Sequence, residues 1–178
     1  MNRNHANRNH ANRNHANKSN AWQQGFSLLE LIVVITIVAL LTGGGLHSWL
    51  AYRQALLLEQ HARHLLAFMT RIQANAYWHN QTDSLWFKSV GDNWCIGNGA
   101  EPASCPPESA FVFTRAVRDA AIAETTSERL VFYGLRNAAQ AGHLTLSNPA
   151  GRVRLVISAR GRLRLCSESR PVQGIPVC

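Results

Sequence analysis

The chemically distinctive residues of this chain are Gly25, Phe26 and Glu30, at the start of a long apolar run. A carboxylate inside a membrane helix costs about 2.5–3.5 kcal/mol on insertion scales, so Glu30 needs a partner. No basic residue lies near it in the run. If the chain is cut after Gly25, the new α-amino group of Phe26 carries a positive charge. Glu30 of a neighbouring subunit can pair with that amine and so set the axial register of packed helices, because an unpaired buried charge is costly.

The apolar run has the length of a membrane span. Residues 26–46 contain one charged residue, Glu30, and about twenty residues at ~1.5 Å each cross the hydrocarbon core of a bilayer. Residues 1–25 contain no acid and four basic residues: Arg3, Arg8, Arg13 and Lys18. Basic flanks remain in the cytoplasm, so we predict a single-pass protein whose N-terminus is cytoplasmic and whose remainder is periplasmic.

The leader, residues 1–25, is repetitive. Residues 2–16 are three copies of Asn-Arg-Asn-His-Ala, and residues 17–21 resemble a fourth. Without apolar periodicity, this segment is predicted to be disordered. Histidines spaced by five share no helix face, so we predict no metal site here.

Residues 47–80 are predicted to continue the helix in amphipathic form, since no proline interrupts residues 26–80. The apolar positions, spaced alternately by four and three, are Leu58, Ala62, Leu65, Met69, Ile72 and Ala76. The opposite face carries Gln54, Glu59, Gln60, Arg63, Arg71 and Asn75. Each glycine of residues 43–45 weakens a helix by ~1 kcal/mol relative to alanine, which predicts a hinge or a melted turn there.

Residues 81–178 form the predicted head. Segments with strand-like composition or alternation are 85–90, 94–96, 110–113, 130–133, 143–146, 153–158 and 163–166. The last two are predicted to form a hairpin that turns at residues 159–161. Residues 98–107 and 116–127 are predicted loops, the second with room for a short helix. The expected fold is α+β, with one long N-terminal helix packed on an antiparallel sheet.

The four cysteines, Cys95, Cys105, Cys166 and Cys178, all follow the apolar run and lack the spacing of a zinc site. Their even number favours disulfides in an oxidising compartment. Three pairings are possible, and free buried thiols are the alternative. We favour Cys95–Cys105 and Cys166–Cys178, because each closes a short loop containing Pro, Gly or Ser.

Around Gly25, Phe26 and Glu30 the chain resembles the type IV prepilin family, which includes the pseudopilins of type II secretion. The resemblance rests on a basic leader ending in glycine, an aromatic residue and a glutamate at the fifth mature position of an apolar helix. It implies cleavage between Gly25 and Phe26 by a prepilin peptidase, N-methylation of Phe26 and assembly directed by Glu30. It also implies a bacterial inner-membrane location before assembly and helix packing with major and minor pilins. An ordinary secretory signal cut near residues 41–45, or an uncleaved anchor, leaves Glu30 unexplained.

The head resembles the prepilin peptidase-dependent protein A group of minor pilins, which is related to FimT-like and H-type (GspH) subunits. The residues that carry this resemblance are 76–80, 94–95, 132–137, 141–143 and 161–166. It implies a low-abundance subunit that primes assembly or lies near the fibre tip, without catalytic activity. Whether the fibre is a type IV pilus or a type II secretion pseudopilus stays open at this point.

The net charge of +8 is unevenly distributed, since half of it lies in the leader. Two Gly-Arg-x-Arg strings near the C-terminus contain Arg152 and Arg154, and Arg162 and Arg164. The second string resembles an element linked to DNA binding in FimT-like pilins. Residues two apart in a strand share a face, so Arg162 and Arg164 would present a paired cation to phosphates. The alternative is a solvated strand face whose charge serves solubility.

No residues suggest an enzyme or a bound cofactor. The scattered acids and histidines form no nucleophile–base pair or close carboxylate pair. His61 and His64 lie three apart on the predicted helix, but two ligands without a third make a poor metal site. We therefore expect no catalytic residue, no metal and no cofactor.

Overall fold

The structure is a computed structural model that describes residues 26–126, 129–168, 171–172 and 174–178, without the side chains of residues 44–47. The predicted disorder of the leader, and Gly25, therefore lie outside the described residues. The chain divides into two compact units, Met1–Leu41 and Thr42–Cys178.

One helix, α1 (Leu28–His79), contributes to both units. This agrees with the predicted long helix. The predicted melted turn at residues 43–45 is wrong, because the helix is assigned without a break there. Helix propagation is cooperative and each glycine costs only ~1 kcal/mol, so strong helix formers on either side outweigh the three glycines.

The part of α1 in the second unit packs through the face that the sequence predicts. Its six apolar positions, Leu58, Ala62, Leu65, Met69, Ile72 and Ala76, are all at most 1% exposed. On the opposite face Gln60, Arg63 and Arg71 are exposed. Burial of this apolar face supplies the main stabilising free energy of the contact between the helix and the sheets.

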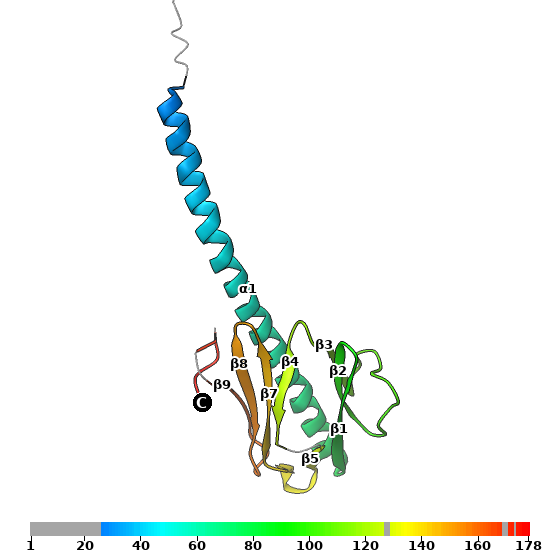
Figure 1. Cartoon of the computed structure of the whole chain (residues 1–178). Helices are drawn as coiled ribbons and strands as arrows, with labels where there is room; N and C mark the ends of the chain where they lie inside the picture. Colours follow the sequence, from blue (N-terminus) through cyan, green and yellow to red (C-terminus); the bar gives the residue numbers. More distant parts are fainter. Residues whose placement is uncertain (1–25, 127–128, 169–170, 173) are drawn as a thin grey trace, which may run out of the picture. The chain divides into compact units, whose positions relative to one another are not determined.

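Two antiparallel sheets cover this face of α1 (Figure 1). The five-stranded sheet has the order β3-β2-β1-β5-β6, with β1 (Thr82–Val90), β2 (Asn93–Asn98), β3 (Val112–Ala116), β5 (Arg129–Tyr133) and β6 (Ala138–Ala139). The four-stranded sheet has the order β4-β7-β8-β9, with β4 (Ala121–Thr125), β7 (Gly142–Asn148), β8 (Gly151–Ile157) and β9 (Leu163–Ser167). A short 3-10 helix, η1 (Leu135–Asn137), joins β5 to β6.

The α+β class is confirmed, and so is the hairpin of β8 and β9. The prediction of one sheet is wrong, because there are two. The prediction of a loop over residues 116–127 is also wrong, because β4 lies within it and pairs with β7. Ala121–Thr125 has little strand signal of its own, and its conformation depends on pairing with a distant segment.

An aromatic cluster forms the core under the five-stranded sheet. Phe113 lies between Phe68 of α1, at 5.8 Å between ring centroids, and Trp94 of β2, at 5.5 Å. The Trp94 Nε1–H donates to Ala120 O, so its one polar group is satisfied inside the core. Aliphatic side chains of β7 and β8 fill the core under the other sheet: Leu144, Leu146, Val153, Leu155 and Ile157.

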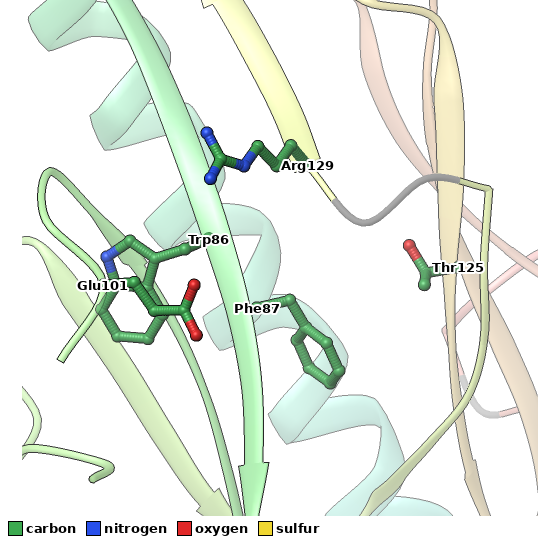
Figure 2. Close-up of a pocket in the computed structure, with 5 residues that line it drawn as sticks. All are labelled: Trp86, Phe87, Glu101, Thr125 and Arg129. Carbon is green, nitrogen blue, oxygen red and sulfur yellow. The ribbon is translucent and has the colours of Figure 1, made fainter. Parts of the chain in front are cut away.

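Two disulfides join Cys95 to Cys105 and Cys166 to Cys178, the pairing that the sequence favours. The first ties the segment between β2 and β3 to β2, and Lys88 Nζ adds a hydrogen bond of 2.9 Å to Pro102 O. Beside this segment the Trp86 indole lies on Gly97, where an added Cβ would come 2.2 Å from Trp86 Cζ2. Trp86 lines a cavity of about 340 Å³. Figure 2 shows its indole with the four other lining side chains.

Candidate functional site

The first candidate site is the N-terminal part of α1. Phe26 is 82% exposed, and the Leu31 N–H donates to Ser27 O as the helix begins. Glu30 lies in the first helical turn, where the positive end of the helix dipole favours a carboxylate. Among the described residues no ion pair involves Glu30. Gly25, the predicted residue before the cut, lies outside the described residues.

Apart from Glu30, the surface of residues 28–41 is apolar and exposed in the described structure. The large exposed side chains are Leu28, Leu29, Leu31, Ile32, Val33, Val34, Ile35, Ile37, Val38, Leu40 and Leu41. Apart from Glu30, the polar side chain between them is Thr36, whose Oγ1–H donates to Ile32 O at 2.7 Å and so does not interrupt the apolar surface. By length and composition α1 can cross a membrane, with a mean hydropathy of 2.3 in its most apolar window. Such a surface needs lipid or other apolar helices around it.

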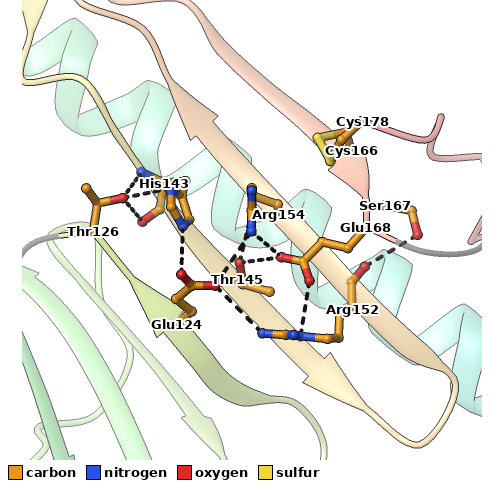
Figure 3. Close-up of polar contacts among 10 residues, drawn as sticks. All are labelled: Glu124, Thr126, His143, Thr145, Arg152, Arg154, Cys166, Ser167, Glu168 and Cys178. Atoms are coloured by element: carbon orange, nitrogen blue, oxygen red, sulfur yellow. Dashed lines mark hydrogen bonds and ion pairs between the residues drawn. A yellow bond between two sulfur atoms is a disulfide. The ribbon is translucent and has the colours of Figure 1, made fainter.

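The second candidate site comprises the outer face of the four-stranded sheet and the turn before β9, which together carry the arginines of both Gly-Arg-x-Arg strings. The structure pairs the first two with carboxylates (Figure 3). Arg152 Nε lies 3.2 Å from Glu168 Oε2, and Arg154 Nη2 lies 2.7 Å from Glu168 Oε1. Glu124 Oε2 lies 3.8 Å from Arg152 and 3.6 Å from Arg154. These ion pairs join β4, β8 and the segment after β9.

The buried hydroxyl of Thr145 adds a hydrogen bond to this network. Thr145 is fully buried, and its Oγ1–H donates to Glu168 Oε1 at 3.1 Å. The Glu168 side chain is only 16% exposed, so two guanidinium groups and a hydroxyl compensate its desolvation. Arg152 and Arg154 thus form ion pairs with carboxylates of the same chain. Sequence reasoning missed both acids, because Glu124 and Glu168 are distant from the arginines along the chain and no local spacing signals their approach.

Arg162 and Arg164 are arranged differently. Both are exposed, and no ion pair within the described residues involves either of them. Arg162 precedes β9, and its backbone N–H donates to Ser158 Oγ at 3.0 Å in the turn, so the pair does not lie in one regular strand. Arg164 lies opposite Val156 in the register of β8 and β9, and it lines a groove of about 450 Å³ together with Arg154, His143, Cys166 and Cys178.

Gly161, the first residue of the second string, has a structural reason to be glycine. Its φ of +72° is in the left-handed region, and an added Cβ would lie 2.3 Å from Asn137 O. The carbonyl of Gly161 accepts a hydrogen bond of 2.7 Å from Gln73 Nε2 of α1. The turn before β9 therefore packs on the helix, and this fixes where Arg162 emerges.

His61 and His64 of α1 contact Arg115, a residue that the sequence analysis did not identify. Arg115 of β3 donates from Nε to His61 Nδ1 at 3.2 Å, and its Nη2 lies 3.2 Å from His64 Nδ1. Glu108 pairs with the same guanidinium. Burial, and then the Arg115 charge, lower the pKa of His61 below its ordinary value. Within the described residues no three His, Cys, Asp or Glu side chains are grouped to hold a metal.

Comparison with known proteins bears on the first site. A family model described as the prokaryotic N-terminal methylation motif matches residues 23–46, which include Gly25, Phe26 and Glu30. This motif is typical of type IV pilins and pseudopilins. Neither the comparison with curated proteins nor that with solved structures gave a match.

Proposed function

We propose that the chain is a type IV pilin-like prepilin, since the N-terminal methylation motif matches residues 23–46, and that it is a minor pilin of a type IV pilus that helps to initiate or cap the fibre. The observation that carries this proposal is the exposed apolar surface of residues 28–41, in which Glu30, in the first helical turn, is the one charged residue. A soluble domain has no use for such a surface, whereas a subunit that moves from lipid into a bundle of helices does. The disulfide-closed head then lies outside the bundle as a stable periplasmic domain.

Processing would complete the site. Cleavage between Gly25 and Phe26 by the prepilin peptidase exposes the α-amino group of Phe26, which is then methylated and keeps its positive charge. In the assembled fibre this amine pairs with Glu30 of a neighbouring pilin, because the bundle interior penalises an isolated carboxylate. The inner membrane is the proposed location before assembly.

A minor pseudopilin of the H type in a type II secretion system would use the same N-terminal chemistry. The two systems differ in the readout of a gene deletion. Loss of surface fibres with retained secretion supports the pilus, whereas loss of secretion with retained fibres supports the pseudopilus.

The main test combines deletion with substitution of Glu30. We expect deletion to abolish or shorten the fibres while the major subunit accumulates in the membrane. Glu30→Ala should reproduce this phenotype, whereas Ser27→Ala, which keeps the Ser27 carbonyl that accepts from Leu31, should not. Unchanged fibres after deletion would refute the role in assembly. N-terminal sequencing of the membrane-extracted chain should give methylated Phe26, and an intact leader would refute the processing step.

DNA binding is the second candidate function, and the exposure of Arg162 and Arg164 favours it. Since Arg152 and Arg154 are paired with acids, only the second string offers exposed guanidinium groups without an ion pair in the described chain. Binding of the detergent-solubilised mature chain to duplex DNA should weaken with salt, and the slope should fall by about one for each phosphate that an arginine no longer neutralises. A double Arg162→Ala, Arg164→Ala variant should lose binding. An unchanged salt slope in that variant would mean that the arginines serve solubility.

A further inference from the structure

An exposed aromatic pair lies at the C-terminal end of α1. Trp78 is 79% exposed and Tyr77 is 52% exposed, although tryptophan is highly buried on average in folded proteins. Their ring centroids are 5.9 Å apart, and the ring planes meet at 71°. Neither side chain belongs to the hydrophobic core or to the sites described above. Both therefore offer uncovered ring surface to a ligand.

The pair lines a groove between α1 and η1. The groove has a volume of about 190 Å³, and its lining residues are Thr70, Gln73, Ala74, Tyr77, Trp78 and Asn137. An added Cβ on Gly134 would lie 2.3 Å from Ala76 O, so the chain that enters η1 packs closely on the helix. Gln73 Nε2 donates to Gly161 O at 2.7 Å, which brings the turn before β9 to the same groove. Three segments that are distant along the chain thus meet here.

The charged side chains of these three segments are all basic, apart from the histidine His79. Residues 70–79, 133–137 and 158–162 contain no aspartate or glutamate but four arginines: Arg71, Arg136, Arg160 and Arg162. All four are exposed, and no ion pair within the described residues involves any of them. The first three adjoin, along the chain, a residue that lines the groove or contacts its lining. This charge is complementary to a polyanion.

The backbone of η1 is held in an uncommon conformation at the groove. Arg136 and Asn137 have φ angles of +63° and +51°, in the left-handed region that costs free energy for residues other than glycine. No residue of η1 is buried, so burial of its side chains in the core does not explain this conformation. Such residues are concentrated at ligand sites. The conformation of η1 therefore supports a binding role for this wall.

We propose that the groove binds single-stranded DNA, with one base stacked on the Trp78 indole and phosphates paired with Arg71, Arg136 and Arg160. The combination of exposed rings with arginines that lack an ion pair in the described chain argues for this occupant. Every nucleobase has a π-face that stacks on an aromatic ring, and the phosphates supply the negative charge. An apolar protein segment would match only the rings, and a polyanion without bases would match only the arginines. A duplex keeps its bases within its own stack, so the contact with Trp78 requires a single strand.

This inference rests on the second candidate function, DNA binding by the head, and names the strand type and a contact for it. Arg162 and Arg164 can neutralise the phosphates of a duplex or of a single strand. Trp78 instead requires an unpaired base. The groove therefore assigns the head a preference for single strands that arginines alone would not produce.

The test uses the detergent-solubilised mature chain and three labelled probes of equal length. They are an oligothymidylate of about twelve nucleotides, an abasic strand with the same phosphates, and a duplex. Fluorescence anisotropy gives the dissociation constant for each probe. Trp78→Ala should weaken the binding of oligothymidylate about tenfold, because one stacked base is lost, and should leave the abasic strand and the duplex within about twofold. Trp78→Phe keeps a ring face and should retain most of the affinity.

The arginines of the groove should act on the phosphates and not on the base. Arg136→Gln and Arg160→Gln should each weaken oligothymidylate and the abasic strand alike, and each should lower the slope of log affinity against log salt by about 0.7. Phe111→Ala is the matched control, because Phe111 is also exposed, at 45%, but lies in the segment before β3. It should change none of the three affinities.

Equal affinities of the unaltered chain for oligothymidylate and the abasic strand would overturn the proposal, and so would an equal loss on all three probes in Trp78→Ala. No binding of oligothymidylate would also overturn it and would assign the aromatic pair to a protein contact. If Trp78→Ala does not keep both disulfides and the unfolding midpoint, ultraviolet crosslinking of oligothymidylate to the unaltered chain decides instead. The crosslinks should map to Tyr77 or Trp78, and crosslinks confined to other residues overturn the site.

Failure of the groove and failure of the second candidate function give different results. If Arg162→Ala with Arg164→Ala abolishes duplex binding but Trp78→Ala leaves oligothymidylate binding unchanged, DNA binding stands and the stacking site is refuted. If the unaltered chain binds neither the duplex nor a single strand, both are refuted. The role in fibre assembly is tested separately by the gene deletion.

Discussion

The two ends of α1 use apolar side chains for opposite purposes. In residues 28–41 they are exposed, as at Leu40 with 72%, whereas in the second unit Leu65 and its neighbours on the same face are at most 1% exposed. One end therefore contributes little to the folding of this chain and offers its surface to lipid or other helices. The other end supplies the core on which both sheets pack. A buried apolar face indicates a fold, and an uncovered one indicates a partner.

Truncating one leucine at each end of α1 tests whether the two ends differ in their contribution to stability. Leu65→Ala leaves a cavity in the core and should lower the free energy of unfolding of the head by about 2–5 kcal/mol. Leu40→Ala removes exposed surface and should leave that free energy unchanged. The measurement is urea unfolding of both variants in the same detergent, followed by near-UV circular dichroism.

The reciprocal readout is incorporation into fibres. Leu40→Ala should reduce incorporation at normal head stability, because it removes part of the uncovered surface. Equal destabilisation by the two substitutions would mean that residues 28–41 pack against the head, and the comparison would fail.

The Cys166–Cys178 disulfide closes the C-terminal part of the head covalently. Cys166→Ser with Cys178→Ser opens a loop with a sequence separation of 12 and frees the C-terminal segment that pairs with Ser167. We expect a loss of about 2–3 kcal/mol in head stability, by the entropy of the opened loop. Helix content in residues 28–41 should not change. Thermal unfolding of the double variant and the unaltered chain, both without reductant so that Cys95–Cys105 stays closed, checks this, and equal midpoints would contradict it.

Patterns over short stretches of sequence predicted those parts of the fold whose contacts join residues close along the chain. The face from Leu58 to Ala76, the hairpin of β8 and β9 and both disulfides follow from periodicity, turn residues and short cysteine separations. Such features involve residues close along the chain, so a single sequence reports them. The melted turn at residues 43–45 was wrong, because a propensity argument for three glycines ignored the cooperativity of the surrounding helix.

Features that depend on distant pairing escaped prediction. β4 is a strand only because β7 lies beside it, and the split into two sheets follows from that pairing. The partners of Arg152 and Arg154 escaped for the same reason, since Glu124 and Glu168 reach them from two other elements. Two strings with the same Gly-Arg-x-Arg pattern thus have different surroundings in the fold, and the difference comes from tertiary contacts.

Two glycines provide a matched test of smaller size. Gly161→Ala forces a left-handed residue and places a Cβ 2.3 Å from Asn137 O, so we expect a loss of about 1–3 kcal/mol in head stability. Gly43 lies in α1 with nothing within 4 Å of an added Cβ. Gly43→Ala should leave head unfolding unchanged. Chemical denaturation of both variants checks the difference, and a stable Gly161→Ala variant would show that the turn before β9 is not fixed on α1.

The smallest effect is a pH dependence confined to the packed end of α1. The pKa of His61 is lowered from 6.5 by burial and then by Arg115, while His64 acts in the same direction and Asp119 and Glu108 oppose it. The folded state thus binds fewer protons than the unfolded state between the lowered pKa and 6.5. The stability from neutral His61 is full above 6.5 and is lost as the pH falls through 6.5 towards the lowered pKa. Unfolding by urea between about pH 7.5 and pH 5 should show this loss, and His61→Gln, which keeps an acceptor for Arg115, should reduce it. The carboxylates are the same in the unaltered chain and in His61→Gln. Equal pH slopes of the unfolding free energy in these two proteins would therefore assign the dependence to a group other than His61.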